Sequence, residues 1–516
     1  MKEIEDTAFK SGSNPYDFYS QFPNFARDAA TIPFANPLGA ILTEKATETD
    51  YTVPGLMTIA FYPTVGVSHD YTSPMNRSSI RFYTYMRSIQ KASAAYDHQD
   101  ITMMVTALDN VIMFHDLLVR AYRVMNLWTP VNEYYPRALI AAMGLSYDSL
   151  KANLSDFRLY INNLGFQISQ YAIPQDVKMI SRHRWLVSGL YTDSEATRAQ
   201  TYMFVPQGFW KYDNTVATGS QLTYVEWLGT IASPNIHTFE QVVTFGDGLM
   251  NAMSNEADFA IISGDMFSFF NGNVMILPEV QEKEIILPTY DKVVLSQIEN
   301  LRIAGKWGQG YTPIISQDPS VNGGAIIFEP QMKARSFNAD SGSNLSSYLN
   351  SRSSVKMNFH NDSPSAEQVM EASRFIYTAE VNNEESSNNG NTVIKSCGTE
   401  LVSGLRIWHI NPTTGSYRFY EMSSPLFLFQ ATSTVGAVAA NFQSITDFYQ
   451  FDWAPMIDVF VYQGSAGDHT FTYEGLLADV DVFSYIYDNY IENMNTAALY
   501  SLWNISQTGA RDRANA

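Results

Sequence analysis

The segment from Lys178 to Trp185 has the side chains best suited to binding a charged ligand. It reads Lys-Met-Ile-Ser-Arg-His-Arg-Trp, so half of its eight side chains can carry positive charge. On a helix, Lys178 and Arg182 share one face, and Trp185 follows about one turn after Arg182. Cationic side chains in this arrangement contact phosphate groups, and a tryptophan can anchor the contact by packing. No base-reading module is visible, so any contact with RNA would be independent of base sequence.

Three arginines earlier in the chain could extend this surface. We therefore predict a candidate RNA-facing basic patch made of Lys178, Arg182, His183, Arg184, Arg77, Arg81 and Arg87. The alternative is that these helices form salt bridges to neighbouring subunits, and the sequence leaves both interpretations open.

Motifs of catalysis are missing from the sequence. The eight histidines form no HExxH pair, and neither a GxSxG elbow nor a GxxxxGK[ST] phosphate loop occurs. His115-Asp116 lies in an apolar stretch and is expected to be a structural pair. Glu474, Asp479 and Asp481 could hold a cation, but acidic pairs arise by chance in such an acidic segment. We predict no catalytic residue, no cofactor and no metal site.

The composition favours a surface that is used for assembly. Hydrophobic residues make up 45% of the 516 residues, charged residues only 16%, and there are 31 tyrosines. Soluble proteins usually have about 25% charged residues. Subunit contacts are poor in charge and rich in aromatic side chains, so this composition is typical of a protein whose surface becomes buried against other copies.

The net charge of −20 is distributed unevenly. Residues 1–74 have 4 basic and 9 acidic side chains, residues 75–215 have 14 and 11, and residues 216–516 have 14 and 32. The middle segment alone is positive, so it could lie beside a polyanion that the remainder would repel.

Cellular location is indicated by what the sequence lacks. Cys397 is the only cysteine, which excludes an intrachain disulfide and a cysteine-based metal cluster. We expect Cys397 to be a surface thiol in a polar loop. The sequence has no signal peptide and no uninterrupted apolar run of about 18–20 residues, which predicts a protein without stable membrane insertion.

Helical periodicity dominates residues 75–192. Ile101, Met104, Val105, Leu108 and Ile112 follow the helical period, and apolar residues on the opposite side predict a helix buried on more than one side. A single stripe of apolar residues predicts one further helix; its members are Leu150, Leu154, Phe157, Ile161, Leu164 and Ile168. Short strands are expected at 201–205 and 274–277, and a last helix from Asp481 to Trp503.

These elements predict a mainly α fold with a β-containing insertion, an α+β class. Frequent prolines make residues 1–74 an extended N-terminal arm. Residues 75–215 form a helical body, residues 216–422 an acidic, β-rich insertion, and residues 423–516 return to the helical body with a C-terminal helix.

Several short stretches of the chain resemble the capsid proteins of picobirnaviruses, which have a segmented double-stranded RNA genome. The resemblance extends over roughly residues 20–300 and depends on the order and number of the stretches. They are Arg27 to Phe34, Asn36 to Gly39, Val53 to Ile59, Pro63 to Gly66, Tyr134 to Leu139, Ala142 to Gly144, Asn153 to Arg158, Arg182-His183-x-Trp185 and Gln297 to Asn300.

The resemblance implies that residues 75–215 and 423–516 form a helical shell domain and that residues 216–422 form a protruding domain. It also implies homodimers that tile an icosahedral shell around double-stranded RNA. It implies a virion protein that assembles in the host cytoplasm, with itself and genomic RNA as partners. One departure concerns the N-terminus: family members can have a basic N-terminal extension, whereas residues 1–30 here contain only Lys2, Lys10 and Arg27 as basic residues. Packaging therefore depends on the inner shell surface, or an extension is missing from this chain.

Two other functions stay open at the level of sequence. The first is a phage or other non-capsid assembly protein, which would form filaments or tubes. The second is an enzyme of unknown class with its site in the insertion, because catalytic groups can come together from distant positions.

Overall fold

The computed structural model describes residues 22–32, 41–44, 49–89, 96–127, 134–175, 177–195, 199–216, 219–230, 232–321, 324–333, 354–361, 363–380, 391–411, 414–422, 426–429, 444–463 and 470–502. Helices and strands are interspersed along these residues, and the strands form several sheets. The predicted α+β class is confirmed.

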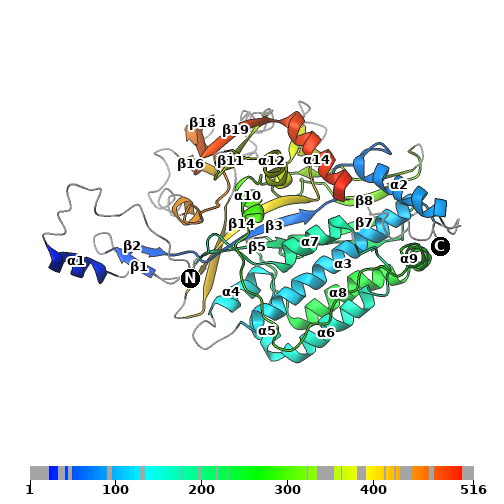
Figure 1. Ribbon diagram of the computed structural model, residues 1–516, viewed down its shortest axis with the longest axis horizontal. Helices are drawn as coiled ribbons and strands as arrows, with labels where there is room; N and C mark the ends of the chain where they lie inside the picture. The colour runs from blue at the N-terminus through cyan, green and yellow to red at the C-terminus, as the bar shows by residue number, and fades with distance from the viewer. Residues whose placement is uncertain are drawn as a thin grey trace.

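A five-stranded sheet of order β15-β14-β3-β5-β4 crosses the middle of the molecule (Figure 1). Its strands are β3 (Leu56–Pro63), β4 (Tyr191–Thr192), β5 (Thr201–Pro206), β14 (Glu400–Ile410) and β15 (Tyr417–Met422). β3 runs parallel to β5 and antiparallel to β14, so Ile59 lies opposite both Phe204 and Leu405. All residues of β3, β5 and β14 are buried, as expected for strands that are covered on both faces.

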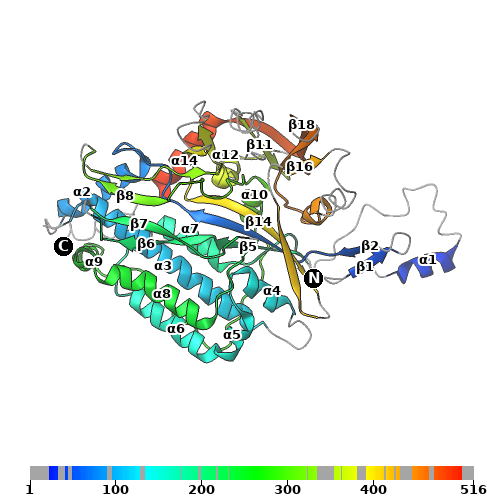
Figure 2. The same cartoon turned by 180° about the vertical axis from the view of Figure 1, so that it is seen from behind.

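The position of β3 corrects the expectation of an arm over residues 1–74. β3 lies inside that range, yet it is a central strand, because its apolar residues are buried between two neighbouring strands. Only the elements before it leave the body, at one end of the molecule (Figures 1 and 2). These are α1 (Pro23–Ala30), which has no buried residue, and the antiparallel pair β1 (Ile41–Glu44) and β2 (Thr49–Thr52).

The helix α3 (His98–Met125) is the centre of the helical body. Asp97 begins it, because its side chain accepts hydrogen bonds from the backbone N–H groups of Gln99 and Asp100. α3 is buried on all sides, which confirms the prediction from its apolar pattern. It is long and apolar enough to cross a membrane, but that whole stretch is buried inside this protein as a core helix.

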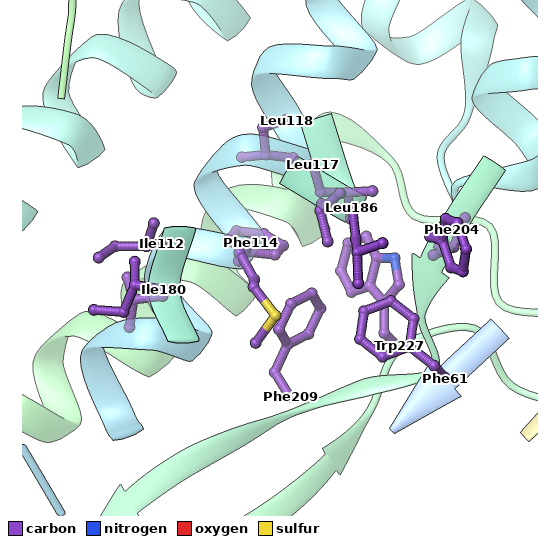
Figure 3. Packing of buried hydrophobic residues seen from close by; sticks show 14 of the residues in the cluster. Phe61, Ile112, Phe114, Leu117, Leu118, Ile180, Leu186, Phe204, Phe209 and Trp227 are labelled. Carbon is purple, nitrogen blue, oxygen red and sulfur yellow. The ribbon is translucent and has the colours of Figure 1, made fainter. Parts of the chain in front are cut away.

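Several elements of the described chain pack against α3. The helices among them are α2 (Pro74–Ile89), α4 (Tyr134–Ala142), α6 (Leu154–Ile168), α7 (Lys178–Ser188), α8 (Phe239–Ser254) and α9 (Ala257–Phe269), and the strands are β6 (Gly208–Asp213), β7 (Gln221–Glu226) and β9 (Ala325–Ile327). Figure 3 shows Phe114 of α3 facing Phe209 and Trp227. The ring centroid of Phe114 lies 5.4 Å from that of Phe209 in β6 and 5.3 Å from that of Trp227, which directly follows β7. Aromatic edge contacts therefore join α3 to this pair of strands.

The apolar stripe from Leu150 to Ile168 corresponds to two helices instead of one. α5 (Tyr147–Ala152) ends at Asn153, and α6 begins at the next residue. The Asn153 side chain donates to the carbonyl of Ser149, a local bond that competes with continuing the helix. The stripe itself is correct for α6, since Phe157, Ile161, Leu164 and Ile168 are all buried.

The range 216–422 is mixed, which corrects the expectation of a β-rich insertion. It contains α8 and α9, which pack onto α3, and also α10 (Lys292–Glu299) and α12 (Ala366–Ala372). Residues 274–277 are not a strand, since only Val274 forms an isolated bridge, with Pro174. Further strands of this range are β8 (Ile314–Asp318), β9 (Ala325–Ile327), β10 (Gln331–Met332), β12 (Thr378–Glu380) and β13 (Thr392–Ser396). Together with β6 and β7 they form the sheets β6-β7-β8-β9 and β10-β13-β12.

A smaller unit contains the C-terminal part of the described chain. β11 (Ser354–Phe359) pairs with β19 (Val482–Tyr487), and the 3-10 helix η4 (Ser373–Phe375) and α14 (Asp488–Leu502) lie beside them. The expected helix from Asp481 thus begins only at Asp488, because residues 482–487 are a strand; Trp503 lies outside the described residues. A further sheet, β16-β17-β18, consists of β16 (Leu426–Phe429), β17 (Ile457–Gln463) and β18 (Thr470–Leu477).

Candidate nucleic-acid interface

The seven residues predicted to face RNA lie on two helices. Arg77, Arg81 and Arg87 are on α2, and the other four are on α7. α14 packs against both helices. The two sets differ strongly in exposure, so they are described separately.

The arginines of α2 are exposed. α2 begins at Pro74, a residue suited to the first turn, and it contains three arginines and no acidic residue. Met75, Phe82 and Met86 are buried in the main core, which directs the opposite face outward. Arg77 and Arg81 are four residues apart and share this outer face. Neither forms an ion pair with any residue that the structure describes.

Arg87 is held by a neighbouring aromatic ring. Its guanidinium group donates a hydrogen bond to the Tyr83 hydroxyl and lies 5.3 Å from the centroid of that ring. This contact orients the guanidinium without neutralising it, because tyrosine is uncharged at neutral pH. α2 therefore presents three positive charges on a chain whose net charge is −20.

Arg182 of α7 is buried and paired with a carboxylate. Its Nε donates to Oε1 of Glu400 at 2.7 Å, and a terminal nitrogen donates to Oε2 of the same residue at 3.2 Å. The same terminal nitrogen donates to the Gln297 side-chain oxygen at 3.2 Å. This bidentate arrangement uses the donors that a phosphate would need. Arg182 therefore does not fit the predicted role in RNA contact, because it is out of reach and already bonded.

His183 is buried between two carboxylates. Its Nδ1 lies 2.7 Å from Oδ2 of Asp109, and its Nε2 lies 3.4 Å from Oε1 of Glu400. Burial opposes the charged imidazolium, but Asp109 and then Glu400 outweigh this effect and raise the pKa of His183 to about 10. His183 is thus a buried cation at neutral pH, and it too does not fit a phosphate contact.

Glu400 connects the two cations. Burial would raise the pKa of its carboxyl group, but Arg182 and His183 hold that pKa well below its usual range. Asp109 and Glu400 therefore face Arg182 and His183, and the buried guanidinium of Arg374 also lowers the pKa of Glu400. This buried network joins α3, α7 and β14, so its role is to fix these elements to one another.

The remaining α7 residues lie nearer to solvent. The Arg184 Nε donates to Oδ2 of Asp116 at 2.7 Å, and Nδ1 of His115 lies 3.6 Å from Oδ1 of Asp116. His115 and Asp116 are both buried, in agreement with a structural pair. Lys178 is exposed in the first turn of α7. Of the α7 candidates, only Lys178 resembles the α2 arginines in its surroundings.

The thiol of Cys397 is buried, which corrects the prediction of a surface thiol. It packs in a small core with Tyr62, Ile394 and Leu401, and burial raises its pKa to about 12. The polar stretch before Cys397 suggested an exposed loop. In the structure, Cys397 follows directly after the paired strand β13.

Among the described candidate cation ligands, Asp481 pairs with a histidine. His360 lies between Asp481 and Glu299, with nitrogen-to-oxygen distances of 2.7 Å and 3.1 Å. Within the described ranges, no group of three or more acidic, histidine or cysteine side chains could hold a metal ion. The side chain of Glu474 lies outside the described residues.

Sequence reasoning missed the partners Asp109, Glu400 and Gln297. They lie 74, 218 and 115 residues from the α7 side chains that they contact. The one signal in the sequence is that Asp109 and Glu400 stand beside apolar residues, where an unpaired charge would be costly.

Comparison with known proteins gives a consistent result. A family model described as the picobirnavirus capsid protein matches residues 18–471. A capsid protein precursor of human picobirnavirus (strain Human/Thailand/Hy005102/-) is 29% identical over 534 aligned residues, which cover 98% of this chain and 94% of the relative. A solved structure, the X-ray structure of the picobirnavirus capsid, has a TM-score of 0.77 at 20% identity and covers 96% of this chain and 99% of its own. That likeness shows a common fold.

Proposed function

The chain belongs to the picobirnavirus capsid protein family, and we propose that it assembles as homodimers into an icosahedral shell around a double-stranded RNA genome. Family membership makes it a viral capsid protein, a structural component of the virion. Family membership also argues against the alternative of a phage assembly protein, and it supports a structural role for the chain.

Composition supports the self-assembly part of the proposal. Only 16% of the residues are charged, and aromatic residues make up 14%. A shell needs each copy to bury surface against others, and such surfaces are depleted of charge and enriched in tyrosine. The single cysteine is buried, so the contacts are non-covalent and suit assembly in the host cytoplasm.

The exposed arginines of α2 carry the RNA part of the proposal. Arg77, Arg81 and Arg87 face outward from a helix without acidic residues, and Lys178 adds a further exposed cation. Point charges on a helix surface neutralise phosphates without reading bases. We place this face toward the packaged RNA, with the exposed acidic surface of residues 216–422 directed away from it and the N-terminal arm, from α1 to β2, resting on the shell.

The test is electron microscopy of the chain expressed alone, combined with size-exclusion chromatography. Closed, uniform spherical particles that contain nuclease-protected RNA are the expected result. Filaments, or a monomer that persists across salt and pH, would contradict the shell. Closed but empty particles would contradict only the RNA contact.

A further inference from the structure

A strip of exposed aromatic side chains lies on β19. Phe483, Tyr485 and Tyr487 alternate along this strand and are 49%, 63% and 59% exposed. The intervening Ile486 faces the other way and packs against the small core of Val355, Met357 and Ile491. We call the three exposed residues the aromatic strip. Neighbouring aromatic residues with this exposure mark a surface that another molecule covers.

The backbone of β19 is open on one side. β19 pairs with β11 along its whole length, from Val482 opposite Phe359 to Tyr487 opposite Ser354. Within the described residues, no strand pairs with its other edge. An edge of this kind offers a row of unpaired N–H and C=O groups to another strand.

The strip is uncharged although the chain is strongly acidic. Residues 482–487 contain no charged side chain, and the Nζ of Lys356 on the neighbouring strand lies 4.1 Å from the centroid of the Phe483 ring. Two copies with a charge of −20 each repel one another, so they approach at the lowest electrostatic cost where carboxylates are missing. This feature favours a second copy of the chain as the molecule that covers the strip.

We propose that β19 pairs with β19 of a second copy in an antiparallel arrangement centred on Tyr485. Two identical strands in antiparallel pairing are related by a two-fold axis, which gives a closed dimer. Centring on Tyr485 puts the two copies of Tyr485 opposite each other and puts Phe483 opposite Tyr487 of the partner subunit. All of these pairs are aromatic cross-strand contacts. The strand ends at Tyr487, so the pairing contains only the uncharged residues 482–487 of each copy and brings no carboxylates opposite each other.

This inference rests on the proposed function, since it identifies the strand through which two copies of the capsid protein join. The first variant is Tyr485→Glu, which places two carboxylates on the two-fold axis. We expect the chain to fold with unchanged circular dichroism and to dimerise at least about tenfold more weakly, because like charges opposite one another are destabilising. Light scattering after size-exclusion chromatography measures the dimer.

The matched control is Tyr71→Glu, which adds the same charge at a 44% exposed tyrosine outside the strip. The inference is overturned if Tyr485→Glu dimerises as the wild type does, or loses no more association than the control. Failure of the wild type itself to assemble would instead overturn the proposed function.

A second variant, Tyr485→Cys, keeps the test decisive even if the glutamate variant does not fold. Cross-strand neighbours have Cβ atoms about 4.5–5.5 Å apart, close to the separation that a disulfide spans. Cys397 is buried, so the new thiol is the reactive one. Mild oxidation of assembled protein should give a covalent dimer on a non-reducing gel, and Tyr71→Cys should not. A Tyr485→Cys protein that gives no more covalent dimer than Tyr71→Cys would reject the β19 pairing.

Discussion

The helices α2 and α7 both contain several basic residues, but most of those on α2 are exposed and most of those on α7 are paired with carboxylates. On α2, Arg77 and Arg81 point outward and have no ionic partner among the described residues. On α7, Arg182 and His183 point inward to Glu400 and Asp109. The first pair is available to a polyanion, whereas the second pair fixes α7 to a strand and to the core helix.

This difference shows that a basic motif can contribute in two ways, either as exposed charge for binding or as buried charge that stabilises the fold. A cation in water gains little from a fixed partner, so it stays free for phosphate contact. A cation that is removed from water needs a carboxylate, and losing either partner leaves a charge in a medium of low polarity. Each experiment below tries to break this contrast between the two helices.

The largest effect is expected for Arg182→Ala. The substitution leaves Glu400 buried without its bidentate partner, which typically costs about 3–5 kcal/mol of folding free energy. Urea denaturation of the unassembled chain measures it. Arg77→Ala is the matched control and should change the stability by less than about 0.5 kcal/mol. Equal stability of the two variants would remove the contrast.

The triple variant Arg77→Glu, Arg81→Glu and Arg87→Glu should act on RNA instead of on folding. Loss of three phosphate contacts should lower the affinity for double-stranded RNA on the order of 100-fold and reduce the slope of log affinity against log salt by about 3. Filter binding across a salt series and the RNA content of purified particles measure both. Unchanged RNA content with intact shells would reject the role of α2.

The protonation of His183 should make stability fall at alkaline pH. The folded pKa of about 10 lies above the unfolded value of about 6.5, so the contribution is complete below pH 6.5 and is lost as pH rises toward 10. The free energy of unfolding should fall by up to about 1.4 kcal/mol per pH unit in this window. His183→Gln should flatten the fall, and His69→Gln, at an exposed histidine, should not. Parallel pH profiles for the wild type and His183→Gln would show that the histidine is not a buried cation.

A smaller effect is expected for Arg184→Ala. The Arg184 side chain is about one-third exposed, so water replaces part of its contact with Asp116. We expect a loss of about 1 kcal/mol in the free energy of unfolding, less than for Arg182→Ala. A loss as large as that of Arg182→Ala would mean that the exposed fraction of an arginine on α7 does not determine how much it stabilises the fold.

Much of the fold could be predicted from local pattern. The helices of residues 75–192 follow from apolar spacing, and the all-round burial of α3 follows from apolar residues on both of its sides. The break at Asn153 and the strand at residues 482–487 were missed, because the helical period continues through both. The burial of Cys397 was missed as well, since its neighbours in sequence are polar while its neighbours in space are apolar.

The sequence by itself determined the class of the protein: an α+β chain with little charge, a positive segment between acidic ones, and short motifs typical of the picobirnavirus capsid protein family. Only the tertiary structure decided which basic residues are free. Arg182 and Glu400 are 218 residues apart, and β3 (Leu56–Pro63) pairs with β5 (Thr201–Pro206) and β14 (Glu400–Ile410), which are also distant in the sequence. Local spacing sets which side chains share a face of a helix, whereas the exposure of that face depends on which distant segment packs against it.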